Sequence, residues 1–225
     1  MGTAPSGTST VLDGFHLEIA RIAGRVLEPH GFALGGGYAL QAHGVTDRPS
    51  KDLDTYTQSQ DPVDYQAGEV ALVSALSQTG FDCRVARRDS WFRQIVVTDR
   101  ASGEQVAVDL GYDYRLRPPV RIEGVGPVLD LDDVIVGKTR ALLDRQAERD
   151  YFDIDRIIAS SLRSPSELYE GIRPIRPELS MGEFARVIEL AHEGDPEEYV
   201  ALGLSLDDML ALFERLAVAA QSLRT

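Results

Sequence analysis

Helical and extended hydrophobic patterns alternate along the first half of the chain. Apolar residues recur every three to four positions in two long stretches, which predicts amphipathic helices, and shorter stretches enriched in β-branched residues predict strands. The predicted helices cover 11–30, 38–42 and 65–76, and the predicted strands cover 32–34, 52–57, 83–85, 92–97 and 105–110. We therefore expect a mixed α/β unit in this half.

Helical spacing dominates the second half. The predicted helices there cover 134–143, 151–158, 181–191 and 206–223. The first ten residues, rich in Gly, Ser, Thr and Pro, contain too few apolar side chains to pack. The sequence thus predicts an α+β fold with a flexible leader over 1–10, an α/β domain over 11–125 and a helical domain over 126–225.

Composition narrows the setting in which the chain works. Its 225 residues are 43% hydrophobic, enough for a substantial core, and its single cysteine, Cys83, excludes an internal disulfide framework. No apolar run approaches the roughly 20 residues that a membrane helix needs. We expect a soluble, cytoplasmic protein with no membrane partner.

The formal net charge of −13 argues against a broad basic surface for nucleic acid. A local one remains open, because arginines gather at Arg84, Arg87, Arg88 and Arg93. Ordinary solvated side chains that balance nearby acids explain such a cluster equally well.

Two carboxylates two residues apart form the strongest chemical signal. In an extended segment, Asp52 and Asp54 project from the same face while Leu53 points to the other. A divalent cation relieves the repulsion between such carboxylates, and oxygen ligands favour Mg²⁺ or Mn²⁺. Asp109 lies in an otherwise apolar predicted strand; if that strand neighbours the first, three carboxylates meet as metal ligands suited to nucleotidyl transfer.

Three consecutive glycines, Gly35, Gly36 and Gly37, link a predicted strand to a predicted helix. Such a turn lets backbone N–H groups approach a phosphate closely, although many glycine turns only relieve crowding. Further along the chain, Lys138 and Arg145 are seven residues apart on one helical face and could clamp a triphosphate. Surface ion pairs are the plain alternative for these two residues and for Asp150.

The order of these motifs resembles the AbiEii/AbiGii-type (MenT-like) nucleotidyltransferase toxins of the polymerase-β-like superfamily. Residues 34–40 and 48–54 are similar to that family's Gly-Gly-x-Ala-Leu and Arg-x-Ser-x-Asp-Leu-Asp motifs. Residues 138–145 and 149–154 are similar to its Lys-x-x-Ala-x-x-x-Arg and Arg-Asp-x-x-Asp-Leu motifs. The departures are small: Tyr38 stands where Thr is common, Ile154 replaces Leu, and Gly35 precedes the usual glycine pair.

The resemblance implies a polymerase-β-like mixed sheet with flanking helices and an appended helical domain. It implies that an NTP is bound by Gly36, Gly37, Ser50, Lys138 and Arg145. It also implies that Asp52 and Asp54 hold the metals. Asp109 could act as the base for the acceptor hydroxyl, and Asp150 could orient Lys138 or assist the acceptor.

Three functions remain open from the sequence. The first is a toxin that transfers a nucleotide from an NTP to tRNA and has a cognate antitoxin, both by family resemblance. The second keeps this chemistry but modifies a cationic small molecule, such as an aminoglycoside, or a protein hydroxyl; the acidic composition motivates it. The third is a non-catalytic interaction module, which intact carboxylates argue against.

Overall fold

The computed structural model describes residues 14–225, so the predicted leader lies outside the described residues. The chain divides into two compact units, one through Asp133 and one from Val134. No helix within the described range is both long and apolar enough to cross a lipid bilayer.

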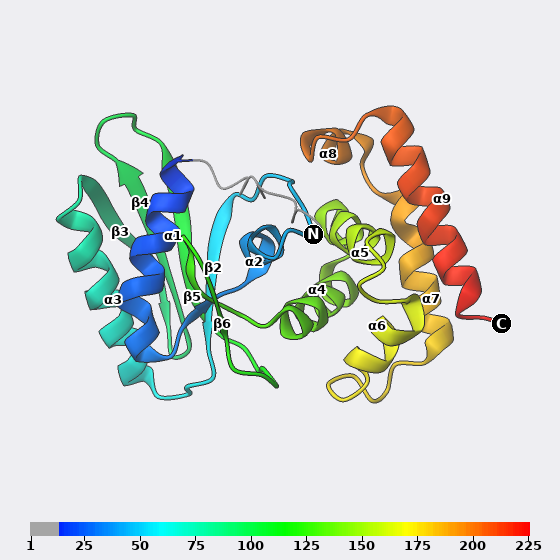
Figure 1. Cartoon of the computed structure of the whole chain (residues 1–225), viewed down its shortest axis with the longest axis horizontal. Coiled ribbons are helices and arrows are strands. Elements are labelled where there is room, and N and C mark those ends of the chain that lie inside the picture. Colours follow the sequence, from blue (N-terminus) through cyan, green and yellow to red (C-terminus); the bar gives the residue numbers. More distant parts are fainter. Residues whose placement is uncertain (1–13) are drawn as a thin grey trace, which may run out of the picture. The chain divides into compact units, whose positions relative to one another are not determined.

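Unit 1 is built on a mixed sheet of seven strands in the order β3-β4-β5-β2-β1-β7-β6 (Figure 1). The strands are β1 (Ala33–Leu34), β2 (Asp52–Thr57), β3 (Phe81–Asp89), β4 (Phe92–Asp99), β5 (Gln105–Tyr112), β6 (Val120–Ile122) and β7 (Gly126–Val128). β2 runs parallel to β5 and antiparallel to β1. The segment that carries the predicted carboxylates is therefore an interior strand.

Two helices, α1 (Gly14–Leu27) and α3 (Pro62–Ser77), pack on each other and cover one face of the sheet (Figure 1). This helix-covered face holds the alternate strand residues that are fully buried, such as Leu53, Val108 and Ile95. The opposite face, here called the carboxylate face, holds the half-exposed alternates. Period-two alternation in β2 and β5 thus separates core from candidate chemistry.

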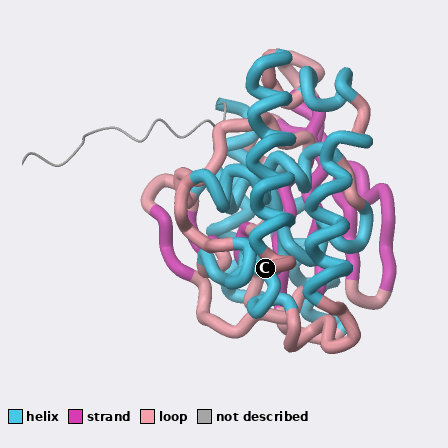
Figure 2. Tube along the Cα trace, turned by 90° about the vertical axis from the view of Figure 1, so that its right-hand side faces the viewer, coloured by secondary structure: helices cyan, strands magenta, loops and turns pink. Residues whose placement is uncertain are grey.

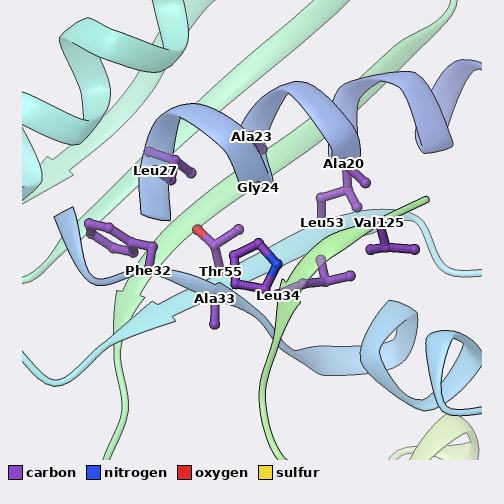
Figure 3. A pocket seen from close by; sticks show the side chains of 11 residues that line it. Ala20, Ala23, Gly24, Leu27, Phe32, Ala33, Leu34, Leu53, Thr55 and Val125 are labelled. Carbon is purple, nitrogen blue, oxygen red and sulfur yellow. The ribbon is translucent and has the colours of Figure 1, made fainter. Parts of the chain in front are cut away.

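A small cavity of about 10 Å³ lies under the helix-covered side of β1 and β2 (Figure 3). Ala20 and Ala23 of α1 and Leu53 and Thr55 of β2 contribute to its lining. It has room for about one water molecule, and its walls are almost entirely apolar, so it is a packing gap too small for a substrate. The candidate chemistry lies on the other face.

A short helix, α2 (Gly36–Ala42), follows β1 and packs against β2. The helix predicted over 11–30 continues after α1 only as the 3₁₀ turn η1 (Glu28–His30), because Pro29 removes a backbone donor. β6 and β7 were not predicted from the sequence. The expected start of the helical domain at residue 126 falls on β7, which pairs with β1 and extends the sheet.

Residues 134–225 contain helices and connecting loops and no strand. Figure 2 shows helices in cyan and loops in pink around the C-terminus. The helices are α4 (Leu131–Arg145), α5 (Glu148–Ala159), α6 (Pro165–Ile172), α7 (Met181–Glu189), the 3₁₀ turn η2 (Leu190–Glu193), α8 (Pro196–Ala201) and α9 (Leu206–Ser222). The four helices predicted from periodicity are all present. The short α6 and α8 were missed, although a serine or aspartate cap followed by proline opens each of them.

Candidate active site

The glycine turn lies directly against the carboxylate of Asp54. The Gly35 N–H donates to the Asp54 carbonyl oxygen over 2.8 Å and extends the pairing of β1 with β2. Gly36 has a φ of +62°, and a Cβ at this position would lie 1.8 Å from Asp54 Oδ2. Both the backbone conformation and the close approach of the carboxylate therefore require glycine at position 36.

The next glycine is held against the loop that precedes β2. A Cβ on Gly37 would lie 2.8 Å from Ser50 Oγ and 3.2 Å from Arg48 Nη2. The Tyr38 hydroxyl donates to the Ser50 carbonyl oxygen over 2.8 Å, and the Gln41 amide donates to the Arg48 carbonyl oxygen over 2.6 Å. These bonds tie α2, which begins at the glycine turn, to the loop that carries Arg48 and Ser50.

Three carboxylates project from the same face of neighbouring strands. Asp54 of β2 is the register partner of Asp109 in β5, so their Cα atoms lie about 5 Å apart, as in any adjacent pair. Asp52 lies two residues before Asp54, with the fully buried Leu53 between them. The sequence prediction that the strand of Asp109 neighbours that of Asp52 and Asp54 is confirmed.

Asp109 is hydrogen-bonded by residues of both neighbouring strands, β4 and β2. The Gln94 side-chain amide of β4 donates to Asp109 Oδ1 over 3.0 Å, and the Thr55 hydroxyl donates to the Asp109 carbonyl oxygen over 2.8 Å. Burial raises the pKa of the Asp109 carboxyl, and the nearby Asp52 charge raises it further, while the Gln94 hydrogen bond and the Arg87 charge lower it. The net direction of the pKa is upward.

The two β2 carboxylates fit a magnesium ion without a third. Among residues 14–225, no three His, Cys, Asp or Glu side chains converge closely enough to enclose a metal ion. Mg²⁺ is commonly bound through one or two carboxylates together with substrate phosphates. Asp52 and Asp54 supply two hard oxygen ligands beside the glycine turn, so the donor set suits such a shared site.

A buried ion pair surrounds the lysine predicted from the second half of the chain. Lys138 Nζ of α4 lies 2.8 Å from Asp153 Oδ2 of α5; the Lys138 side chain is 8% exposed and that of Asp153 is fully buried. The idea that Asp150 orients Lys138 is not what the structure shows. Asp153 pairs with Lys138 instead, three residues further along α5.

Asp150 is instead bound by Arg145. The guanidinium donates through Nε to Oδ2 and through Nη2 to Oδ1, both over 2.7 Å, which makes a bidentate pair across the α4–α5 turn. The Ala147 N–H also donates to Asp150 Oδ2 over 3.3 Å. Unit 2 therefore holds Lys138 and Arg145 on separate, specific carboxylate partners.

Sequence reasoning left three of these residues without a role. Gln94 gave no signal, since a glutamine that alternates with apolar residues is also an ordinary strand residue. Arg48 and Asp153 lie inside the motifs at 48–54 and 149–154, beside residues that were assigned a role. That position in a motif is the signal from which a role could have been predicted for them. Chemically, the unit 1 residues combine oxygen ligands, backbone donors and one carboxylate with a raised pKa.

A family model described as nucleotidyl transferase AbiEii toxin, type IV toxin–antitoxin system, matches residues 19–186. No curated protein matches the chain in sequence. The matched residues make up well over half of the chain and include parts of both units.

Solved structures with the same fold include two from Helicobacter pylori, the protein JHP933 and a putative nucleotidyltransferase, each 19% identical. JHP933 has a TM-score of 0.54, with 97% of this chain and 93% of that chain covered. The putative nucleotidyltransferase has a TM-score of 0.55, with 96% of each chain covered. MenT4, a nucleotidyltransferase toxin from Mycobacterium tuberculosis, has a TM-score of 0.50 at 13% identity, with 91% of this chain and 82% of that chain covered.

Proposed function

The chain belongs to the AbiEii family of nucleotidyltransferase toxins of type IV toxin–antitoxin systems, and from that premise we propose that it transfers the nucleoside monophosphate of an NTP to a hydroxyl group of tRNA. Family membership brings an NTP substrate and an antitoxin partner. The observation that carries the proposal is the contact between Gly36 and the carboxylate of Asp54. This contact supports the proposal, because a glycine turn can bind a phosphate and the adjacent carboxylate can bind a metal ion.

Asp52 and Asp54 are proposed to hold Mg²⁺ or Mn²⁺, which would offset the negative charge of the triphosphate when bound. The backbone N–H groups of Gly36 and Gly37 contact phosphate oxygens, and Ser50 lies beside them. Ser50 Oγ is 3.4 Å from Asp52 Oδ1, close enough to orient that carboxylate. The phosphate contact rests on these individual amides, because α2 is only seven residues long.

Asp109 is proposed as the base. Its carboxylate takes the proton of the acceptor hydroxyl while the acceptor oxygen bonds to the α-phosphorus. The bond from the α-phosphorus to the bridging oxygen breaks, and pyrophosphate leaves. A raised pKa suits this role, since it strengthens the carboxylate as a base relative to an ordinary aspartate.

Lys138 and Arg145 are proposed to contact the triphosphate and the departing pyrophosphate. Each is held by a carboxylate in unit 2, Lys138 by Asp153 and Arg145 by Asp150. Lysine and arginine side chains lose conformational entropy when they bind a phosphate, and a carboxylate that already holds the side chain in place reduces that loss. Asp150 thereby supports nucleotide binding by orienting Arg145.

A small cationic acceptor is the second candidate, favoured by the formal charge of −13. The test incubates the protein with each NTP, radiolabelled at the α-phosphate, together with total tRNA, an aminoglycoside or a protein mixture. Labelled tRNA supports the proposal. A labelled aminoglycoside or protein with unlabelled tRNA assigns the acceptor to the second candidate.

The control is the Asp52→Ala variant. Loss of a ligand to the metal is expected to reduce labelling at least a hundredfold, the scale of removing one transition-state contact, on the order of 10²–10³. A variant that labels tRNA as well as the wild type does would rule out the proposed site.

A further inference from the structure

Two arginines of the edge strand β3 point to the carboxylate face. Arg84 and Arg87 are three residues apart, so in a regular strand they would lie on opposite faces. A β-bulge at Ala86 shifts the pairing: Arg84 is opposite Val96 and Arg87 is opposite Gln94. Val96 and Gln94 are two residues apart on β4, so the bulge brings both arginines to one face.

Each arginine begins a row of register partners that crosses four strands and ends at a β2 carboxylate. One row runs from Arg84 through Val96 and Ala107 to Asp52. The other row runs from Arg87 through Gln94 and Asp109 to Asp54. The electrostatic effect of Arg87 reaches Asp109, whose pKa it lowers.

The neighbouring arginines of β3 and β4 form ion pairs with α3, whereas Arg84 and Arg87 remain exposed to solvent. Arg88 and Arg93 face the helix-covered side, where both pair with Glu69 of α3. Arg84 is exposed, and within residues 14–225 its side chain forms no hydrogen bond or ion pair, although its backbone pairs with β4. The Arg87 side chain is 65% exposed, pairs with Asp89 at 2.6 Å, and lies over the Phe92 ring at 5.0 Å.

The glycine turn, which is the proposed nucleotide site, and these arginines lie on opposite sides of β2 in the sheet. The glycine turn follows β1, which borders β2 on one side, whereas β3 lies three strands away on the other. Four strand spacings therefore separate β1 from β3, about 19 Å, too far for a triphosphate held at the glycine turn. Asp109 is about 10 Å from β3, within reach of the part of a polyanion just behind the group that reacts.

We propose that Arg84 and Arg87 bind backbone phosphates of the RNA acceptor, close behind the hydroxyl that receives the nucleotide. The inference rests on the proposed function for the identity of the acceptor. Guanidinium groups bind phosphate oxygens in bidentate geometry. They also offset the repulsion that Asp52, Asp54 and Asp109 exert on a polyanion, which resolves the conflict between an acidic chain and an RNA substrate.

The test measures binding of tRNA to the full chain without NTP, as a function of salt concentration. The Arg84→Ala/Arg87→Ala variant is compared with Arg100→Ala/Arg121→Ala, which removes the same charge from exposed arginines off the carboxylate face. Each lost single-stranded phosphate contact lowers the slope of log affinity against log salt by about 0.7. We expect a loss of roughly 1.4 in that slope for the first variant and no change for the second.

Folding and nucleotide binding provide independent checks. The Arg84→Lys/Arg87→Lys variant keeps both charges and is expected to recover most of the tRNA affinity, and all variants should bind NTP as the wild type does. A double alanine variant with unchanged tRNA affinity and salt slope overturns the inference, as does a wild-type chain that binds no tRNA. A chain that binds tRNA through these arginines but labels none of it overturns the proposed function, while Arg84 and Arg87 remain assigned as contacts to RNA phosphates.

Discussion

The approach of Asp54 to the glycine turn makes a sharp prediction for the Gly36→Ala variant. Alanine at a φ of +62° costs about 1–2 kcal/mol of backbone strain. In addition, its methyl group would lie 1.8 Å from Asp54 Oδ2, more than 1 Å short of the 3.0 Å below which real Cβ atoms are essentially never found. The carboxylate must therefore move, and a displacement of about 1 Å can cost roughly 10²-fold in rate.

Gly103 is the matched control. Its φ is +76°, so alanine there meets the same kind of backbone strain, but no atom lies within 4 Å of the added Cβ. Both variants should lose about 1–2 kcal/mol of stability by thermal or urea unfolding. Only Gly36→Ala should lose nucleotidyl transfer, measured as label transferred per enzyme at saturating NTP.

The comparison separates strain from chemistry. If Gly36→Ala transfers nucleotide at the rate of Gly103→Ala, the carboxylate does not need the position that the structure gives it, and the reasoning is refuted. Equal loss of transfer in both variants would attribute the effect to general destabilisation.

Three further predictions follow from the ion pairs and the base. The pKa of Asp109 is raised in the folded state, so its contribution to stability is fully present at acidic pH and is lost as pH rises through the folded pKa. Asp109→Asn should therefore stabilise the fold more at about pH 7 than at about pH 4, measured by thermal unfolding at the two pH values. The same variant should abolish transfer. Lys138→Met removes the Lys138 ammonium from the buried Asp153 and should cost about 3–5 kcal/mol in urea unfolding. Lys138→Met/Asp153→Leu should recover much of the loss, and an equally unstable double variant would contradict this. Gln94→Leu removes the donor to Asp109 and should lower kcat with an unchanged KM for NTP; a change confined to KM would assign Gln94 to nucleotide binding instead.

Local patterns were sufficient to predict the strand that carries Asp52 and Asp54 and the glycine turn. The alternation of Asp52, Leu53 and Asp54 needs only the period of a strand, and the strand was predicted with the bounds that β2 has. The glycine turn was equally local. What Gly36 touches was not, because its contact with Asp54 depends on how β1 pairs with β2.

Features that depend on register or on a turn between elements could not be read from the chain. Nothing in the sequence marks Ala86 as a bulge, and a regular strand would put Arg84 and Arg87 on opposite faces. The helical repeat that relates residues of α4 is interrupted at Gln146, which has a φ of +51°. Spacing along the chain therefore could not show that Lys138 meets Asp153 on α5.

The position of the label that reaches the acceptor tests the central claim most directly. Wild-type protein is incubated with tRNA and the same NTP labelled either at the α-phosphate or at the γ-phosphate, with Asp54→Asn as control. Nucleotidyl transfer predicts that tRNA gains the α label and not the γ label, and that the variant gains neither at a comparable rate. Transfer of the γ label, or an undiminished α label with Asp54→Asn, would contradict the account.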